Sequence, residues 1–176
     1  MNFRPHKALT IPKQANGLVA SDKTSLNIFW EQLDDALGDE LSAGIGCYIF
    51  SIRAGKGVLP WYVGLAEKQS FRKECFTHHK ITHYNNAIAA RKGTPLLTLV
   101  AKYTPGGKLV RPTGGGHRDV QHLETMLIGN CLGRNDKLLN VKDTKLLREM
   151  VVPGLLNSPK GKPSATVRAF KSLIGA

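Results

Sequence analysis

Residues 44–80 constrain the fold of this chain more than any other stretch, because two short apolar segments there flank a glycine-bearing polar turn. The first segment carries Tyr48 in the triplet Gly-Cys-Tyr, and the second carries Tyr62 in the triplet Tyr-Val-Gly. Two β-type segments around such a turn predict a hairpin. A helical pattern begins near Ser70 and includes Arg72. Two phenols and a guanidinium would therefore come from adjacent elements of one small unit.

This pattern resembles the signature of the GIY-YIG nuclease superfamily, in which two tyrosines on adjacent strands and an arginine on the next helix line one site. Tyr-Val-Gly is a common variant of the second motif, whereas Cys47 replaces the aliphatic residue that is usual in the first. Arg72 follows Gly64 by eight residues, as the family arginine does. The resemblance covers about residues 44–142.

The chain departs from the family four residues after the arginine, where the family usually has histidine or tyrosine and this sequence has Phe76. Residues 70–92 are predicted to be helical, with a break near Thr82. On that helix, His79 lies one turn beyond Phe76 and is the candidate substitute, unless it is a surface or helix-end histidine. His78 and Lys80 are its neighbours, with a less favourable helical phase.

A second candidate site residue comes from the helix predicted between Asp119 and about Leu132. Glu124 projects inside its apolar arc, which is formed by Val120, Leu123, Leu127, Ile128 and Cys131. A buried carboxylate is costly unless it is paired or binds a metal. An ion pair with a buried arginine, or a place at the arc edge near solvent, would also explain it. The resemblance implies that Glu124 binds the divalent metal.

The resemblance also implicates Asn140, which follows Glu124 by 16 residues. Its amide would brace the metal carboxylate or a phosphate, and the alternative is an ordinary turn or cap asparagine.

Residues 96–103 are almost wholly apolar and predict a third strand that is covered on both faces. The predicted fold is α+β, with a small three-stranded, mainly antiparallel sheet flanked by helices in a single domain.

Three regions are expected along the chain. Residues 1–43 form an arm and a helix, residues 44–142 form the nuclease-like core, and residues 143–176 form a basic, partly helical extension. The arm from 1 to 24 is polar and irregular and is expected to lie extended on the domain or on a substrate.

The charge of the chain favours a polyanionic partner. Its 25 Lys and Arg outnumber its 13 Asp and Glu, giving a net charge of +12. Such a field favours nucleic acid, although solvated lysine faces are common. A membrane surface is the competing partner, but we identify no basic amphipathic helix with a strong apolar face that would favour it.

Three distant cysteines without a Cys-x-x-Cys motif predict buried free thiols in a reducing compartment. The absence of a secretory signal or membrane-length apolar run predicts a cytoplasmic protein.

The resemblance implies a metal-dependent endonuclease that hydrolyses DNA. Mg²⁺ or Mn²⁺ would bind Glu124, and Arg72 would grip a phosphate oxygen. Tyr48 would act as the base, Tyr62 would orient water or phosphate, and His79 would relay protons. A free tyrosine titrates near pH 10, so a phenol that acts as a base at neutral pH needs a cation nearby. The alternatives are a nucleic-acid-binding module of the same fold without catalysis, and an RNA-directed nuclease.

Overall fold

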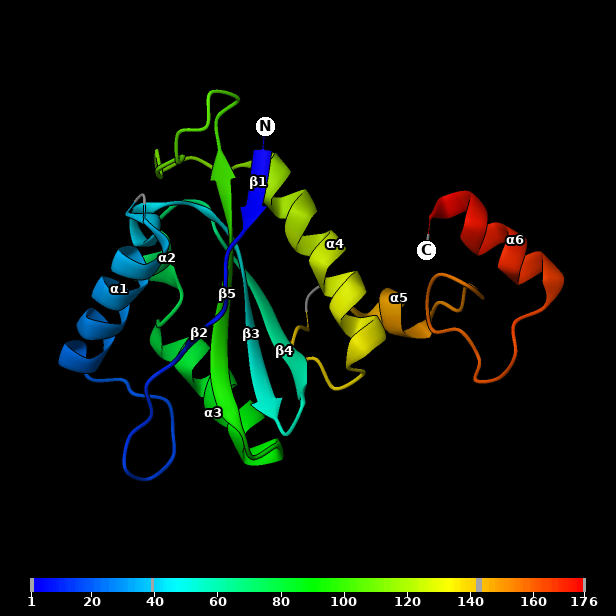
Figure 1. The fold of residues 1–176 in the computed structure, drawn as a ribbon, viewed down its shortest axis with the longest axis horizontal. Helices are drawn as coiled ribbons and strands as arrows, with labels where there is room; N and C mark the ends of the chain where they lie inside the picture. The colour runs from blue at the N-terminus through cyan, green and yellow to red at the C-terminus, as the bar shows by residue number, and fades with distance from the viewer. Residues whose placement is uncertain (1, 39, 142–143, 176) are drawn as a thin grey trace.

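The fold is built on the predicted hairpin, which consists of β3 (Gly46–Ala54) and β4 (Gly57–Ala66). The computed structural model describes residues 2–38, 40–141 and 144–175 (Figure 1). In the hairpin register, Tyr48 lies opposite Gly64 and Phe50 lies opposite Tyr62. The third predicted strand is β5 (Thr94–Tyr103), which pairs antiparallel with the other edge of β3. β3 is therefore central, and its side chains meet packed neighbours on both faces.

The sheet has five strands, so the expected three-stranded sheet was too small. The additional strands are β1 (Asn2–Pro5) and β2 (Leu9–Thr10), and both pair antiparallel with β5. The sheet order is β1-β5-β3-β4, with β2 also on β5. The first residues of the expected arm are thus part of the sheet. They satisfy backbone groups of β5 that would otherwise be unpaired at a strand edge.

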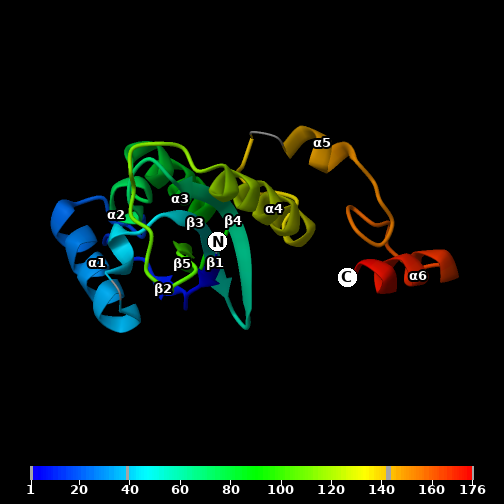
Figure 2. The ribbon, with the colours of Figure 1, turned by 90° about the horizontal axis from the view of Figure 1, so that it is seen from above.

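Helices cover both faces of this antiparallel sheet, which confirms the α+β class. The helices of the chain are α1 (Lys23–Leu37), the 3₁₀ turn η1 (Leu41–Ala43), α2 (Phe71–Glu74), α3 (His78–Ala90), α4 (Arg118–Arg134), α5 (Thr144–Glu149) and α6 (Ala165–Ile174), of which α6 is not among those that cover the sheet. Figure 1 shows α1 and α4 on opposite sides of the sheet, and Figure 2 shows α6 standing apart from it.

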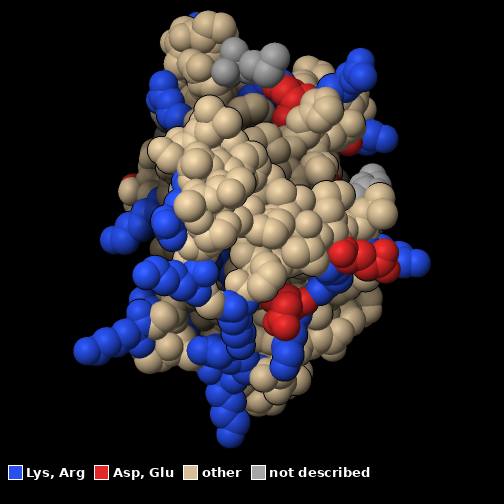
Figure 3. All heavy atoms as spheres, turned by 90° about the vertical axis from the view of Figure 1, so that its right-hand side faces the viewer, with Lys and Arg blue, Asp and Glu red and all other residues tan. Residues whose placement is uncertain are grey.

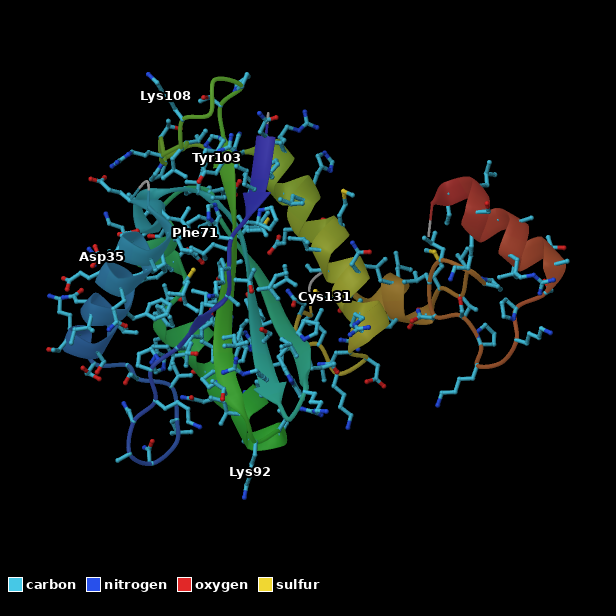
Figure 4. All side chains as sticks on the ribbon, in the orientation of Figure 1. Asp35, Phe71, Lys92, Tyr103, Lys108 and Cys131 are labelled. Carbon is cyan, nitrogen blue, oxygen red and sulfur yellow. The ribbon has the colours of Figure 1, made fainter. Side chains whose placement is uncertain are left out.

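Two hydrophobic clusters follow from the alternation of side chains along β3 and β4. Tyr48, Phe50 and Tyr62 belong to the larger cluster, together with residues of α1, α2 and α3. Val63 belongs to the smaller cluster, with residues of α4, and Ile49 packs against it. In Figure 4, Phe71 of the larger cluster and Cys131 of the smaller one lie on opposite sides of the sheet.

The predicted helix over residues 70–92 is instead two helices, and the break lies before His78 rather than near Thr82. Thr77 has an extended backbone (φ −62°, ψ 154°) and caps α3. The preceding Phe76 packs edge-on against Phe29, Trp30 and Tyr84. This aromatic packing draws the chain between the two helices into the core, and helical phase is lost across it.

The remaining expectations concern thiols, membranes and the C-terminal region. Cys47, Cys75 and Cys131 are buried and free, as predicted. No helix in the described part of the chain is both long and apolar enough to cross a membrane. The expected boundary between residues 142 and 143 lies outside the described residues. Beyond it, α5 contacts α4, whereas α6 buries none of its side chains.

Candidate functional site

A pocket of about 830 Å³ opens at the outer edge of β4, between α3 and α4. Its wall includes Tyr62 from β4, His79 from α3, Glu124 from α4 and Asn140 from the segment after α4. These are four of the six residues that the sequence singled out, and they come from separate parts of the chain. The edge position of β4 explains the pocket, because helices covering opposite faces of the sheet both reach this strand.

The Tyr62 hydroxyl is held by Lys80, whose helical phase had made it a less favourable candidate than His79. The Lys80 Nζ atom donates a hydrogen bond to Tyr62 Oη at 2.6 Å and lies 3.9 Å from Glu74 Oε1. Lys80 and Glu74 both line the pocket. The phase argument failed for Lys80 because α3 begins anew at His78 instead of continuing from Arg72.

His79 lines the pocket as part of a histidine pair. Its Nε2 atom lies 2.9 Å from the Nε2 atom of His83, so one ring donates and the other accepts. The His83 ring stacks on Tyr62, with 5.1 Å between ring centroids. Burial, and then the charges of His79 and Lys80, lower the pKa of His83 below its usual range. His83 was not among the predicted site residues, although its spacing of four from His79 places both on one helix face.

Glu124 occupies the middle of a row of side chains that faces the sheet. Val120, Ile128 and Leu132 share this row at four-residue spacing, and all three are buried. Glu124 itself is half-buried at the pocket wall. Burial raises the pKa of the Cys47 thiol, and the negative charge of Glu124 adds to the effect. The predicted position inside the apolar arc is confirmed, and the pocket is what gives the carboxylate access to solvent.

Tyr48 does not reach the pocket, although it lies on the same face of the hairpin as Tyr62. Its side chain is fully buried, and its ring centroid is 6.4 Å from that of Tyr62. Burial, reinforced by the neighbouring Tyr84, raises the pKa of Tyr48 well above its usual value. A base at neutral pH needs the opposite shift. The role of base implied for Tyr48 therefore conflicts with its surroundings in this structure.

Arg72 also lies outside the pocket wall. It is exposed on α2, a helix of only four residues. Among the described residues, the lysines that line the pocket are Lys68 and Lys80. The spacing from Gly64 placed an arginine on the next helix correctly, but that helix packs against η1 and β4, and its arginine does not line the pocket.

Asn140 lines the pocket with its amide already occupied. Val63 donates its backbone N–H to Asn140 Oδ1 at 2.9 Å, and Asn140 Nδ2 donates to the Val63 carbonyl at 2.7 Å. Nearby, Leu139 N donates to the Trp61 carbonyl at 2.8 Å, and Asn135 Nδ2 donates to that of Pro60 at 2.7 Å. Residues 135–140 thus cover the edge of β4, and the two bonds of Asn140 fix that strand beside Tyr62.

Two carboxylates of the pocket, Glu67 and Glu74, were not predicted. Glu67 follows β4 directly and accepts hydrogen bonds from His117 N at 2.7 Å and Gln121 Nε2 at 2.9 Å. These bonds tie the end of β4 to the start of α4. The sequence offered one signal for Glu67, an acidic residue placed directly after a predicted strand that carries a site tyrosine.

Among the six predicted site residues, Glu124 is the one whose carboxylate could bind the proposed metal ion. Within the described residues, no group of three or more His, Cys, Asp or Glu side chains is arranged to hold a metal ion. Mg²⁺ keeps several waters and binds through one or two carboxylates together with substrate phosphates. A solvent-accessible carboxylate in an open pocket fits that mode and does not fit a closed structural site.

Comparison with known proteins adds no relative to this picture. No protein-family model, no curated protein and no solved structure matches the chain.

Proposed function

We propose that the protein is a metal-dependent endonuclease of GIY-YIG type that hydrolyses DNA phosphodiester bonds in the pocket beside β4. The observation that carries this proposal is the shared pocket wall of Tyr62, His79, Glu124 and Asn140. The sequence pattern and the family resemblance singled out these residues, which are up to 78 positions apart in the chain. Their convergence on one open pocket supports a common role.

Charge supports a nucleic-acid substrate. The net charge is +12, and Figure 3 shows many more Lys and Arg than Asp and Glu side chains on the face that carries the C-terminal region. Such a surface attracts phosphate backbones in a salt-dependent and sequence-independent way. We expect no strict target sequence, and we expect the protein to act in the cytoplasm.

The C-terminal region would add contacts to the backbone of the substrate. Residues 150–176 contain Lys160, Lys162, Arg168 and Lys171 and no acidic residue. Three of these, the lysines, line a second hollow of about 410 Å³ between the 153–164 loop and α6.

In the proposed reaction, the pocket side chains orient water and neutralise the phosphate. Tyr62 Oη accepts from Lys80, so its own proton is free to be directed toward a phosphate oxygen or water. Lys80 and Lys68 supply positive charge beside the phosphoryl group. His79 exchanges protons at the open side of the pocket, with His83 fixing its ring. Glu124 would hold Mg²⁺ or Mn²⁺, whose contribution is to neutralise charge on the phosphate.

This assignment changes two roles from those that the family resemblance implied. Tyr62 takes the place of Tyr48 as the phenol that touches the substrate, and Lys80 supplies the charge expected of Arg72. Tyr48 is buried, and Arg72 does not line the pocket. These two observations also favour the competing function, a DNA- or RNA-binding module of this fold that lacks catalysis. That module would keep the basic surface and would not need Glu124.

Cleavage of supercoiled plasmid tests the proposal, with Mg²⁺, with Mn²⁺ and with chelator. We expect metal-dependent nicking by the wild type and none by Glu124→Gln, because the amide removes the charge that holds the metal. Glu149→Gln, an exposed glutamate of α5, is the matched control and should cleave normally. Thermal unfolding should be similar for all three proteins. A large loss of stability in Glu124→Gln would make the carboxylate structural.

The two tyrosines provide a second arm of the same experiment. Tyr62→Phe should lower the cleavage rate by about two to four orders of magnitude, as is typical for loss of acid–base assistance. Tyr48→Phe removes the same atom from a buried site and should leave the rate within a few-fold of the wild type. The reverse result would restore Tyr48 as the catalytic phenol. Tight binding without cleavage under every condition would favour the binding module, and RNA would then be the next substrate to test.

A further inference from the structure

His79 and His83 form a hydrogen-bonded pair on the side of α3 that faces the pocket. Their Nε2 atoms are 2.9 Å apart, and their rings are nearly perpendicular, at 80°. Both residues line the pocket, and His79 is exposed. Two histidines separated by one helical turn present their rings to the same ligand, an arrangement that also serves zinc in metalloprotease helices.

We propose that His79 and His83 together bind one divalent transition-metal ion of the Cu²⁺ or Ni²⁺ class, in adjacent positions of a square-planar or octahedral centre. A metal–imidazole bond is about 2.0–2.1 Å long. Two such bonds at a right angle place their nitrogens about 2.9 Å apart, whereas a tetrahedral angle places them about 3.3–3.4 Å apart. The observed separation fits the right angle, and tetragonal nitrogen ligation is characteristic of Cu²⁺ and Ni²⁺.

A metal ion on the pair would replace the hydrogen bond that joins the two Nε2 atoms. Burial, and then the charges of His79 and Lys80, lower the pKa of His83 below its usual range. Lys80 is the nearest competing cation, but its ammonium is bonded to Tyr62 Oη and lies near Glu74. Glu74 and Glu124 line the same pocket and offset the positive charge.

The site would be open rather than closed. Within the described residues no third His, Cys, Asp or Glu joins the pair in a metal-holding group. Water would therefore fill the remaining coordination positions, as in sites that exchange ligands and unlike closed structural zinc sites. This pair is distinct from Glu124, which prefers the hard Mg²⁺ or Mn²⁺ ion.

A metal on the pair would also lie beside the ring of Tyr62, which stacks on His83. Ni²⁺ at concentrations that fill the pair should consequently inhibit plasmid cleavage. This consequence rests on the proposed nuclease function, whereas binding of the metal does not. The two ideas can therefore fail separately.

Calorimetric titration of the full chain, without a histidine tag, tests the binding with Ni²⁺ and then with Cu²⁺. We expect one ion per chain and tighter binding of Cu²⁺ than of Ni²⁺. His79→Ala and His83→Ala should each weaken Ni²⁺ binding by about a hundredfold or more, because the second imidazole binds as an intramolecular ligand. His78→Ala is the matched control, since His78 is exposed on the same helix and does not line the pocket. Circular dichroism would verify that each variant is folded.

Three results would overturn the proposal. One is an unchanged Ni²⁺ affinity in folded His79→Ala. Another is an equal loss in His78→Ala, which would point to a different cluster of histidines. The third is tighter binding of Zn²⁺ than of Ni²⁺, which would contradict the right-angle geometry.

Discussion

The two ends of the chain have similar compositions but differ in how they pack against the domain. Residues 2–20 build two strands onto β5 and place Ile11 and Val19 in the core, each with only 1% of its surface exposed. Residues 145–175 contain no buried side chain. Their large apolar residues face solvent, among them Leu146, Met150, Val151, Leu155, Leu173 and Ile174.

The difference teaches that open strand edges, rather than composition, organise the terminal segments. Both ends mix apolar residues with lysines and are interrupted by proline. The N-terminal segment meets the free edge of β5 and pairs with it. The other edge of the sheet, on β4, is already covered by residues 135–140, so the C-terminal segment finds few backbone groups to bond.

The strongest test of this comparison removes one apolar side chain from each end. Ile11→Ala should lower the free energy of unfolding by about 2–5 kcal/mol, because it leaves a cavity in the core. Leu155→Ala should change it by less than about 0.5 kcal/mol, since Leu155 is 62% exposed. Urea denaturation would measure both. Equal losses would show that the C-terminal region packs on the core in solution.

A smaller effect is expected where the core ends and the C-terminal region begins. Asn140→Asp replaces the donor that bonds the Val63 carbonyl with a carboxylate oxygen, and it should cost about 1–3 kcal/mol. Asn157→Asp is the matched substitution in the C-terminal region, where Asn157 Nδ2 donates to the carbonyls of Leu147 and Met150. Its effect on global unfolding should be negligible. A comparable loss at Asn157 would mean that the two regions unfold together.

The smallest effect on stability, and a selective one on binding, is expected from lysine triplets at the two ends. Lys160, Lys162 and Lys171, changed together to Ala, should lower the slope of log affinity against log salt by up to about 2.7, if each lysine contacts a DNA phosphate. The matched triplet is Lys7, Lys13 and Lys23, which are also exposed. Its replacement should change the slope less. Fluorescence anisotropy with duplex DNA would measure this, and equal slopes would remove the special role of the C-terminal lysines.

The sequence predicted those parts of the fold in which local pattern and tertiary environment agree. The alternation around Tyr48 and Tyr62 with a glycine turn specified the hairpin, and apolar spacing around Glu124 specified α4. Strands β1 and β2 escaped prediction because they are short. Only the edge of β5, which is remote in sequence, makes them strands. The phase of α3 escaped because aromatic packing of Phe76 interrupts the helix.

The candidate site shows the same limit. Tyr48 and Tyr62 share one face of the hairpin, and nothing in their spacing tells which one reaches a pocket. The answer depends on strand order, since β3 is central and β4 is at the edge. Likewise, the sequence identified Asn140 as a candidate but did not identify Val63 as its hydrogen-bond partner, because the two residues are 77 positions apart in the chain.

Gly64 has a consequence for how this chain can vary. A Cβ atom at position 64 would lie 2.3 Å from the ring carbon Cζ of Tyr48 and 2.4 Å from its hydroxyl oxygen, which is closer than packed atoms approach. The glycine of the second motif therefore makes room for the tyrosine of the first. The two motifs are one steric unit, and a side chain can enter at position 64 only when the ring at position 48 is lost. Gly64→Ala should be tolerated far better beside Tyr48→Ala than alone, so the two positions would have to change together in any lineage of this protein.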